Sequence, residues 1–153
     1  MVKAVFIEKF SKFITWPNEE KIVEQDSPIV IFVLGKNPFG GILEKVFSKR
    51  LIKNKIVNVI YAKQIEEIPE CQILFISKSM KKEIKTIMTF IKDKPILTIG
   101  DTHGFCEKGV HINMFIEGKN TRFEINNESA IAAGFSFSYH LLKMGKLVGL
   151  EIE

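Results

Sequence analysis

The side chains best suited to chemistry gather in one short stretch, GDTHGFCEKGVHINMF, which runs from Gly100 to Phe115. This stretch follows the apolar run PILTI and contains an aspartate, a glutamate, two histidines and a cysteine. Loops at the ends of buried strands often carry the reactive groups of an enzyme. Metal binding and attack by a cysteine thiolate are the two kinds of chemistry that these residue types allow.

A metal ion would need several of these side chains as ligands. His103, Cys106 and His111 supply three, with Asp101 or Glu107 nearby. Their spacing, H-x2-C-x4-H, differs from the paired C-x2-C and H-x3–5-H arrangements that are typical of zinc sites. His111 also falls inside a predicted strand, where alternation turns it away from Cys106. We therefore expect no metal and no other cofactor.

A thiolate nucleophile at Cys106 would need His103 or His111 as its base and an oxyanion site beside it. Glu107 follows the cysteine directly and opposes a lowered thiol pKa. The residue after the strand is Asp101, and the cysteine comes five positions later, so the stretch forms no nucleophile elbow. A cysteine- or metal-dependent enzyme is therefore the least favoured of three hypotheses, and no catalytic residue is assigned.

A glycine-bearing turn, GKNPFGG, joins a predicted strand to a predicted helix. It lacks the Gly-Lys-Ser/Thr ending of a phosphate-binding loop and the G-x-G-x-x-G spacing of a dinucleotide fold. Free N–H groups at the helix start could still hold an anion. A second hypothesis is therefore a small-molecule-binding domain of the doubly wound type, with a candidate ligand pocket at Gly35, Asn37, Gly40 and Asp101.

The two cysteines, Cys71 and Cys106, are compatible with either redox compartment. Cys71 opens its predicted strand, whereas Cys106 lies beyond the far end of the next one. Two parallel neighbouring strands would hold these positions about 17 Å apart. A disulfide requires Cα atoms within about 7 Å, so we expect two free thiols.

The composition is that of an ordinary globular domain. Of the 153 residues, 46% are hydrophobic and 26% are charged, which argues against disorder. The formal net charge of +4 comes from lysines spread along the chain, and the basic patch from Lys45 to Lys55 has no aromatic stacking platform. Nucleic acid is therefore not an expected partner. No apolar run reaches the ~18 residues of a transmembrane helix.

Apolar periodicity predicts a helix in the N-terminal segment VKAVFIEKFSKFITWP, and Pro17 is expected to end it. Four short apolar runs predict strands: SPIVIFVLG, KIVNVIYA, CQILFIS and PILTIGD. Between the first two of these strands, Asn37 is expected to cap a helix that has Pro38 in its first position.

The C-terminal half continues with a further predicted helix in KSMKKEIKTIMTFIKDK. The segment VHINMFIEGKNTRFEIN predicts a hairpin with its turn at residues 117–120. The last segment, ESAIAAGFSFSYHLLKMGKLV, is expected to be one long, unusually apolar helix.

Strands alternate with helices from Ile29 to Ile99, which indicates parallel pairing through right-handed crossovers. The hairpin then adds antiparallel strands at one side. The sequence therefore predicts an α/β fold: a single three-layer domain over residues 1–153, with a mixed, mostly parallel sheet, a C-terminal antiparallel hairpin and flanking helices.

Several segments, taken in order, resemble the YfiR family of small exported regulatory proteins. KAVFIEKFSKFITWP resembles the opening helix of that family, IVIFVLGKNPFGGILEKV its strand and glycine-bearing turn, and CQILFISKS its next strand. The segment from ILTIGD to LLKMGKLV resembles its whole C-terminal third. Each motif alone is weak, but the ordered set covers nearly the whole chain.

The resemblance changes the interpretation of the opening stretch. His103, Cys106 and His111 fall outside the family pattern. Of this stretch, the residues that fit the family pattern are Asp101, Phe105, Gly109, Ile112 and Asn113, and the resemblance gives a structural role to Pro17, Phe105, Gly109, Asn113, Phe123, Glu124 and Asn126. We therefore expect a structured connector that redirects the chain from a parallel strand into the hairpin, and not a reaction centre.

The resemblance implies a non-enzymatic periplasmic regulator, with the leader peptide absent from this sequence and taken as removed. Its expected partner is the periplasmic region of a membrane-anchored diguanylate cyclase or sensor kinase, which it controls by protein–protein contact. Through that partner it would set cyclic-di-GMP levels and biofilm formation. A homodimer is also expected.

The single tryptophan, Trp16, leaves two alternatives open. It is either a core residue, as large aromatics usually are, or an exposed anchor of the kind enriched at interface centres. In the second case Phe6, Phe10 and Phe13 would join it in a surface for a partner or a second copy of the chain.

Overall fold

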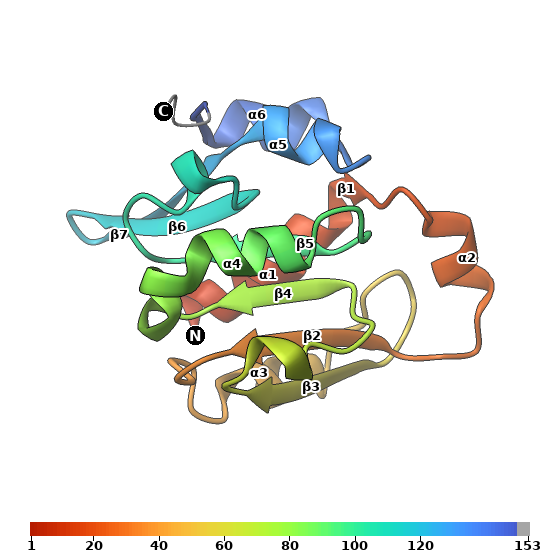
Figure 1. Ribbon diagram of the computed structural model, residues 1–153. Helices are drawn as coiled ribbons and strands as arrows, with labels where there is room; N and C mark the ends of the chain where they lie inside the picture. The colour runs from red at the N-terminus through yellow and green to blue at the C-terminus, as the bar shows by residue number, and fades with distance from the viewer. Residues whose placement is uncertain (150–153) are drawn as a thin grey trace.

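A seven-stranded sheet forms the middle of the computed structural model, which describes residues 1–149 (Figure 1). Within those residues its strand order is β3-β2-β4-β5-β6-β7-β9. The strands are β2 (Ile29–Leu34), β3 (Val57–Ala62), β4 (Ile73–Ile76), β5 (Leu97–Gly100), β6 (Ile112–Glu117), β7 (Asn120–Ile125) and β9 (Lys146–Leu147). Only the β6–β7 pair in this sheet is antiparallel. The predicted α/β fold with a mixed, mostly parallel sheet is confirmed.

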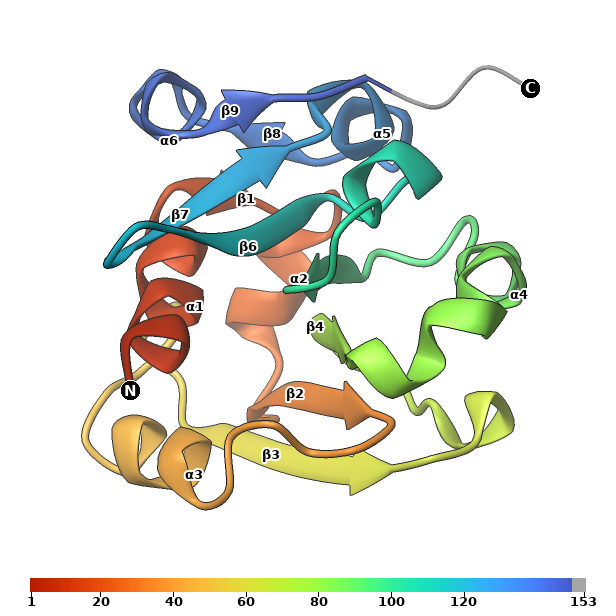
Figure 2. The same cartoon turned by 90° about the vertical axis from the view of Figure 1, so that its left-hand side faces the viewer.

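Helices cover both faces of the sheet. Figure 2 shows α1 and α3 on one side and α4 on the other. The helices are α1 (Val2–Lys12), α2 (Glu19–Glu24), α3 (Ile42–Phe47), α4 (Ile84–Phe90), α5 (Asn127–Ala132) and α6 (Tyr139–Met144). Short 3-10 helices precede or connect them: η1 (Ile65–Glu67), η2 (Lys78–Glu83) and η3 (Cys106–Lys108).

Alternation along the central strands divides the apolar side chains between two cores. In β2, Ile31 and Val33 belong to the core beneath α1 and α3, whereas Phe32 and Leu34 belong to the core beneath α4. Successive side chains of a strand point to opposite faces, so a run of apolar residues without polar alternation suits a strand covered on both sides.

The N-terminal helix is shorter than predicted. It ends at Lys12 and not at Pro17, because Ile14–Thr15 form a short strand, β1, that pairs with β8 (Ser136–Phe137). The pairing continues where the Ser138 N–H donates to the Phe13 carbonyl at 2.8 Å. The β-branched side chains of Ile14 and Thr15 also favour the extended backbone. Trp16 therefore follows a strand and does not close a helix.

The predicted long C-terminal helix is wrong. The segment instead forms α5, β8, α6 and β9. Gly134 has φ +91°, a left-handed conformation that ends α5, and a side chain there would lie 2.9 Å from the Pro17 ring. The Ser138 hydroxyl then caps α6 by accepting from the Leu141 N–H at 3.3 Å.

Two helix starts also differ from expectation. Asn37 does not cap α3, which begins at Ile42 after Gly41. Its side chain instead closes a local turn, because Oδ1 accepts from the Phe39 N–H and Nδ2 donates to the Gly40 carbonyl. The predicted helix at residues 78–94 opens with the six-residue 3-10 helix η2 before α4. The hairpin turn at 117–120 is as predicted.

The N-terminal aromatic side chains are largely internal. Phe10 and Trp16 are 2% and 3% exposed, and Phe6 and Phe13 are half-buried. Phe10 and Phe6 both contact the ring of Phe123. Of the two alternatives for Trp16, the structure favours the core, so the four aromatics do not form an open surface. A role for them in partner binding stays a prediction.

Trp16 joins three parts of the chain. Its indole N–H donates to the Gln72 carbonyl at 3.0 Å, and its ring packs edge-on against Phe135. We therefore predict that Trp16→Ala lowers the free energy of unfolding by about 3–5 kcal/mol, the usual cost of truncating a large buried aromatic.

Urea denaturation of matched variants tests this prediction. Tyr139→Ala removes an aromatic that is 74% exposed and should change the free energy of unfolding by less than about 0.5 kcal/mol. A Trp16→Ala variant as stable as the Tyr139→Ala variant would contradict the core assignment.

Candidate functional site

The segment between β5 and β6, residues 101–111, is called the connector below. It leaves the sheet at Gly100, where an added Cβ would lie 2.5 Å from the Phe105 ring. Phe105 is 1% exposed and belongs to the core beneath α4. The connector then forms η3 and turns at Gly109, whose φ of +106° lies in the left-handed region that glycine tolerates. It is thus folded into the protein at both ends.

The buried amide of Asn113 holds the first half of the connector. Its Oδ1 accepts from the Thr102 N–H at 3.0 Å, and its Nδ2 donates to the Thr102 carbonyl at 2.8 Å. The same Nδ2 donates to Glu124 Oε1 at 3.1 Å on the neighbouring strand. Thr102 is 5% exposed, so its N–H would lack a partner without Asn113, whereas its carbonyl would keep only the bond from the Phe105 N–H at 3.2 Å.

The fully buried Asn126 holds the second half. Its Nδ2 donates to the Cys106 carbonyl at 2.7 Å, and its Oδ1 accepts from the Ser129 N–H and caps α5. The Ser129 hydroxyl in turn donates to the Gly109 carbonyl at 2.6 Å. These bonds tie η3 to the end of the hairpin and to α5. The structure thus brings Asn113, Glu124 and Asn126 together with the connector.

Outside this network lies a groove of about 590 Å³, called the connector groove below. It runs between the connector, β6 and the β9 region. The charged and polar side chains that line it are Asp101, His103, Glu107, Asn113, Glu124 and Lys146. The Asp101 carboxylate pairs with Lys3 at 2.9 Å. One oxygen of Glu107, Oε1, is buried and has no hydrogen-bond partner among the described residues.

His111 is an internal residue, 3% exposed. Its ring Nδ1 accepts from the Thr98 backbone N–H at 3.1 Å, and the backbone N–H of His111 donates to the Thr98 hydroxyl at 2.9 Å. Burial lowers the pKa of His111 to about 4, so the imidazole is neutral at pH 7. Its Nδ1 is therefore turned to Thr98 and is not a base for the connector cysteine.

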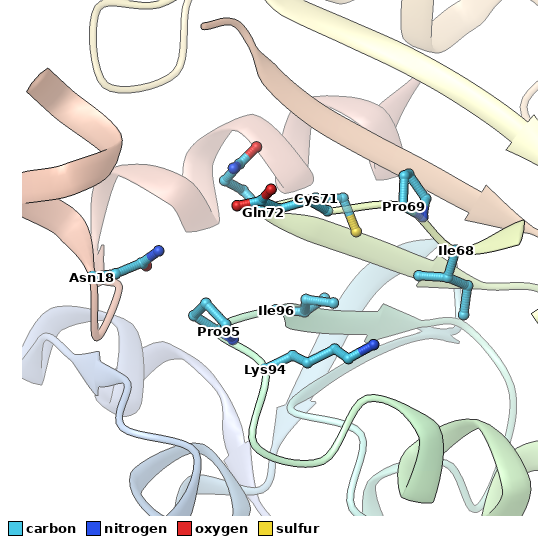
Figure 3. A pocket seen from close by; sticks show the side chains of 9 residues that line it. Asn18, Ile68, Pro69, Cys71, Gln72, Lys94, Pro95 and Ile96 are labelled. Carbon is cyan, nitrogen blue, oxygen red and sulfur yellow. The ribbon is translucent and has the colours of Figure 1, made fainter. Parts of the chain in front are cut away.

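Cys106 and Cys71 are free and buried. The Cys106 thiol donates to the Glu124 carbonyl at 3.5 Å, and burial, then the charges of Glu124 and Glu107, raise the pKa of this thiol strongly. Cys71 lines a small cavity of about 240 Å³ beside Pro95 (Figure 3), where burial raises its pKa to about 12. Both thiols are therefore protonated at neutral pH and are poor nucleophiles.

Within residues 1–149, no group of three or more His, Cys, Asp or Glu side chains lies close enough to hold a metal ion. His103 is exposed in the connector, whereas His111 and Cys106 are buried and bonded to separate partners. The three side chains that suggested a metal site therefore do not converge.

The candidate ligand pocket at the carboxyl ends of the strands is divided. Gly35 follows β2 and Asp101 follows β5, with β4 between them. Two hydrogen bonds close the crevice between β2 and β4. The Lys36 N–H donates to Ser79 Oγ, and Ser77 Oγ donates to the Lys36 carbonyl. An added Cβ at Gly35 would lie 2.6 Å from the Ser79 hydroxyl. The side chain of Asn37 is used in its own turn, where Nδ2 donates to the Gly40 carbonyl, and a Cβ added at Gly40 would have no atom within 4 Å.

The sequence suggested Glu107 only as a possible extra metal ligand and did not identify Lys146 as a site residue. Glu107 carried a signal, because it lies in the connector among residues already under consideration. Lys146 carried none, because its place beside β7 depends on the pairing of β9, a two-residue strand inside a segment predicted as helix.

Within the described residues, no helix has both the length and the apolar character needed to cross a bilayer.

The fold and the site define an α/β domain in which a buried connector leads from a parallel strand into an antiparallel hairpin. The chain belongs to the YfiR/HmsC-like family, whose family model matches residues 1–146. Members of this family are regulators of diguanylate cyclases and are typically periplasmic. A search of curated proteins found no match to the chain.

Because His111 is buried and neutral, the free energy of unfolding depends on pH. The unfolded chain binds a proton at an ordinary histidine pKa of ~6.5, whereas the folded chain binds it only near pH 4. The unfolded state is therefore favoured as the pH falls from 7 to 4. We predict that this histidine alone lowers the free energy of unfolding by about 3 kcal/mol over that range.

Urea denaturation at pH 7, 5.5 and 4 measures this contribution. His111→Asn, whose Oδ1 can accept from the Thr98 N–H, should be less sensitive to pH than the wild-type chain by roughly that amount. His103→Asn removes an exposed imidazole of the same connector and should keep most of the wild-type sensitivity. Equal pH dependence in the wild-type chain and the His111 variant would contradict a buried neutral imidazole.

Proposed function

We propose that the chain is a non-enzymatic regulator that acts in the periplasm. It binds the periplasmic region of a membrane-anchored diguanylate cyclase or, as the second choice, of a sensor kinase. By this contact it sets cyclic-di-GMP levels and so biofilm formation. The observation that carries the proposal is the match of the YfiR/HmsC-like family model over residues 1–146.

The state of the reactive side chains supports a role without catalysis. The pKa of each thiol is raised by burial, and His111 is neutral with its Nδ1 bonded to Thr98. A thiolate nucleophile needs a lowered pKa and a base within hydrogen-bond reach. Cys106 has neither: burial raises the pKa of its thiol, and the thiol donates to the Glu124 carbonyl, which is not a base.

The connector groove is the surface that we propose for the partner. Its carboxylates are Asp101, Glu107 and Glu124, and Asn113 holds Glu124 by a hydrogen bond at 3.1 Å. Glu107 is half-buried in this groove and its Oε1 has no hydrogen-bond partner within the described residues, so this carboxylate can accept from an N–H donor that enters the groove. A basic patch on the partner would pair with it in a charge-assisted hydrogen bond, which is stronger than a neutral one.

We also include a homodimer in the proposal. β3 is an edge strand, and its unpaired backbone groups can pair with a second copy. The apolar side chains of Leu51, Ile56 and Ile60 are 53%, 68% and 41% exposed beside that edge. Antiparallel pairing of two β3 strands about a twofold axis would cover them.

Binding to a cyclase is tested with the purified chain and the soluble periplasmic region of a membrane-anchored diguanylate cyclase from the same organism. We predict that Glu107→Gln weakens this binding at least ~10-fold, which corresponds to about 1.4 kcal/mol. Glu67→Gln, an exposed glutamate of η1, is the matched control and should leave affinity unchanged. Biolayer interferometry measures both variants, and circular dichroism confirms that they fold.

The outcomes separate the parts of the proposal. A well-folded chain that binds neither a cyclase nor a sensor-kinase periplasmic region would contradict the regulatory function. Binding that Glu107→Gln leaves unchanged would move the contact away from the connector groove. Light scattering of the free chain at the same concentrations gives its mass, and a monomer would contradict the proposed pairing through β3.

A further inference from the structure

A second and larger groove, of about 620 Å³, lies near the amino ends of β5 and β6, and it is called the amino-end groove below. It lies between the end of α4 with its following turn, the last residues of the connector, and α5. Its volume falls within the range of ~300–1,000 Å³ that is usual for small-molecule sites. None of the side chains assigned above to partner binding lines it.

The imidazole of His111 lines this groove. Because Nδ1 accepts from the Thr98 N–H, the proton of the neutral ring lies on Nε2. The hydrogen bonds of His111 within the described residues involve Nδ1, the backbone N–H and the carbonyl, and none involves Nε2. The Phe135 ring, with its centroid 5.3 Å from that of the imidazole, contacts the same side chain. The groove thus contains a fixed N–H donor that is not used within the protein.

The rest of the lining combines positive charge with apolar surface. Lys92, Lys94 and Lys108 line the groove against one acidic side chain, Asp93. Met88 of α4, Ile91 directly after α4 and Ala133 directly after α5 supply apolar contacts. The Lys94 ammonium lies 4.3 Å from the Phe90 ring centre, so its charge is already held near an aromatic face. An occupant must therefore offer a hydrogen-bond acceptor, a negative charge and an apolar body.

We propose that the amino-end groove binds a small organic acid. The carboxylate accepts from His111 Nε2–H in the field of the lysines, and the apolar body contacts Met88, Ile91 and Ala133. A hydrogen bond from a neutral donor to a charged acceptor is stronger than one to water or to a neutral carbonyl. The site lies outside the connector groove, so the ligand and a partner protein can bind at the same time.

The buried histidine favours an anion over a cation at this place. Burial lowers its pKa, so the ring stays an uncharged donor at pH 7 and does not itself require a counter-ion. The charge of the ligand is then balanced by the lysines at the rim. A neutral amide of the same shape would retain the apolar contacts and lose this electrostatic contribution.

The probe for this site is 3-phenylpropionate, with 3-phenylpropanamide and inorganic phosphate as comparisons. Calorimetry on the full chain at pH 7 should show binding of the acid, at least ~10-fold weaker binding of the amide, and no binding of phosphate. The chain has three histidines, so their imidazole nitrogens can be followed by NMR. The acid should shift Nε2 of His111 and leave His103 and His140 unchanged.

Two neighbouring residues of α5 provide a matched pair of variants. Ala132 is exposed and lines the groove, whereas Ile131 is 62% exposed and lies outside its lining. Ala132→Trp should fill the groove and reduce affinity for the acid at least ~10-fold. Ile131→Trp places the same bulky side chain on the same helix and should leave affinity unchanged.

Absence of binding by the wild-type chain at millimolar acid would overturn the proposal. Equal binding of the acid and the amide, or equal binding of phosphate, would overturn the assignment of an organic carboxylate. Binding that shifts a histidine other than His111, or that Ala132→Trp leaves intact, would overturn the location.

Discussion

Two buried asparagine side chains hold together the part of the protein on which its proposed function depends. Asn113 pairs with both backbone groups of Thr102, and Asn126 joins the Cys106 carbonyl to the first turn of α5. A buried peptide group without a partner costs roughly 1–3 kcal/mol. An irregular segment can therefore lie inside the fold only if side chains such as these replace the hydrogen bonds of a sheet or helix.

This constraint explains why the connector carries reactive residue types without a reaction. The segment packs Phe105 and Cys106 inward, and burial raises the pKa of the Cys106 thiol. The residue that follows, Glu107, is half-buried. Burial lowers the pKa of His111, and its Nδ1 is bonded to Thr98 and so is not a base for the cysteine. Burial acts on both groups in the direction that removes charge. What remains at the surface is a shaped acidic groove, which suits recognition better than bond making.

Much of the sheet could be predicted from the sequence, because its apolar β-branched runs and the hairpin signal depend on local pattern. The errors fell where distant pairing overrides that pattern. Ile14–Thr15 looked like the end of a helix, but Ser136–Phe137, more than a hundred residues away, pair with them. The apolar C-terminal segment had the composition of a buried helix, yet Gly134 and Ser138 divide it. Local side-chain bonding likewise placed Asn37 in a turn and not at a helix start.

Part of the site could also be predicted from local patterns in the sequence. The family pattern marked Asn113, Glu124 and Asn126, and the structure joins them in one network with the connector. The unpaired oxygen of Glu107 and the free Nε2 of His111 depend on burial and on which neighbours are already bonded. The spacing of residues in the sequence does not indicate which atoms will lack a hydrogen-bond partner, because this depends on how the fold packs.

Amide hydrogen exchange on an Asn113→Ala variant tests most directly whether buried side-chain amides hold the connector. Loss of the bonds to Thr102 should speed exchange at residues 101–111 at least ~10-fold, while β2 and β3 keep their wild-type protection. Asn37→Ala, which removes an exposed asparagine from a surface turn, is the control and should leave the connector unchanged. Wild-type exchange throughout the connector of the Asn113 variant would contradict the account.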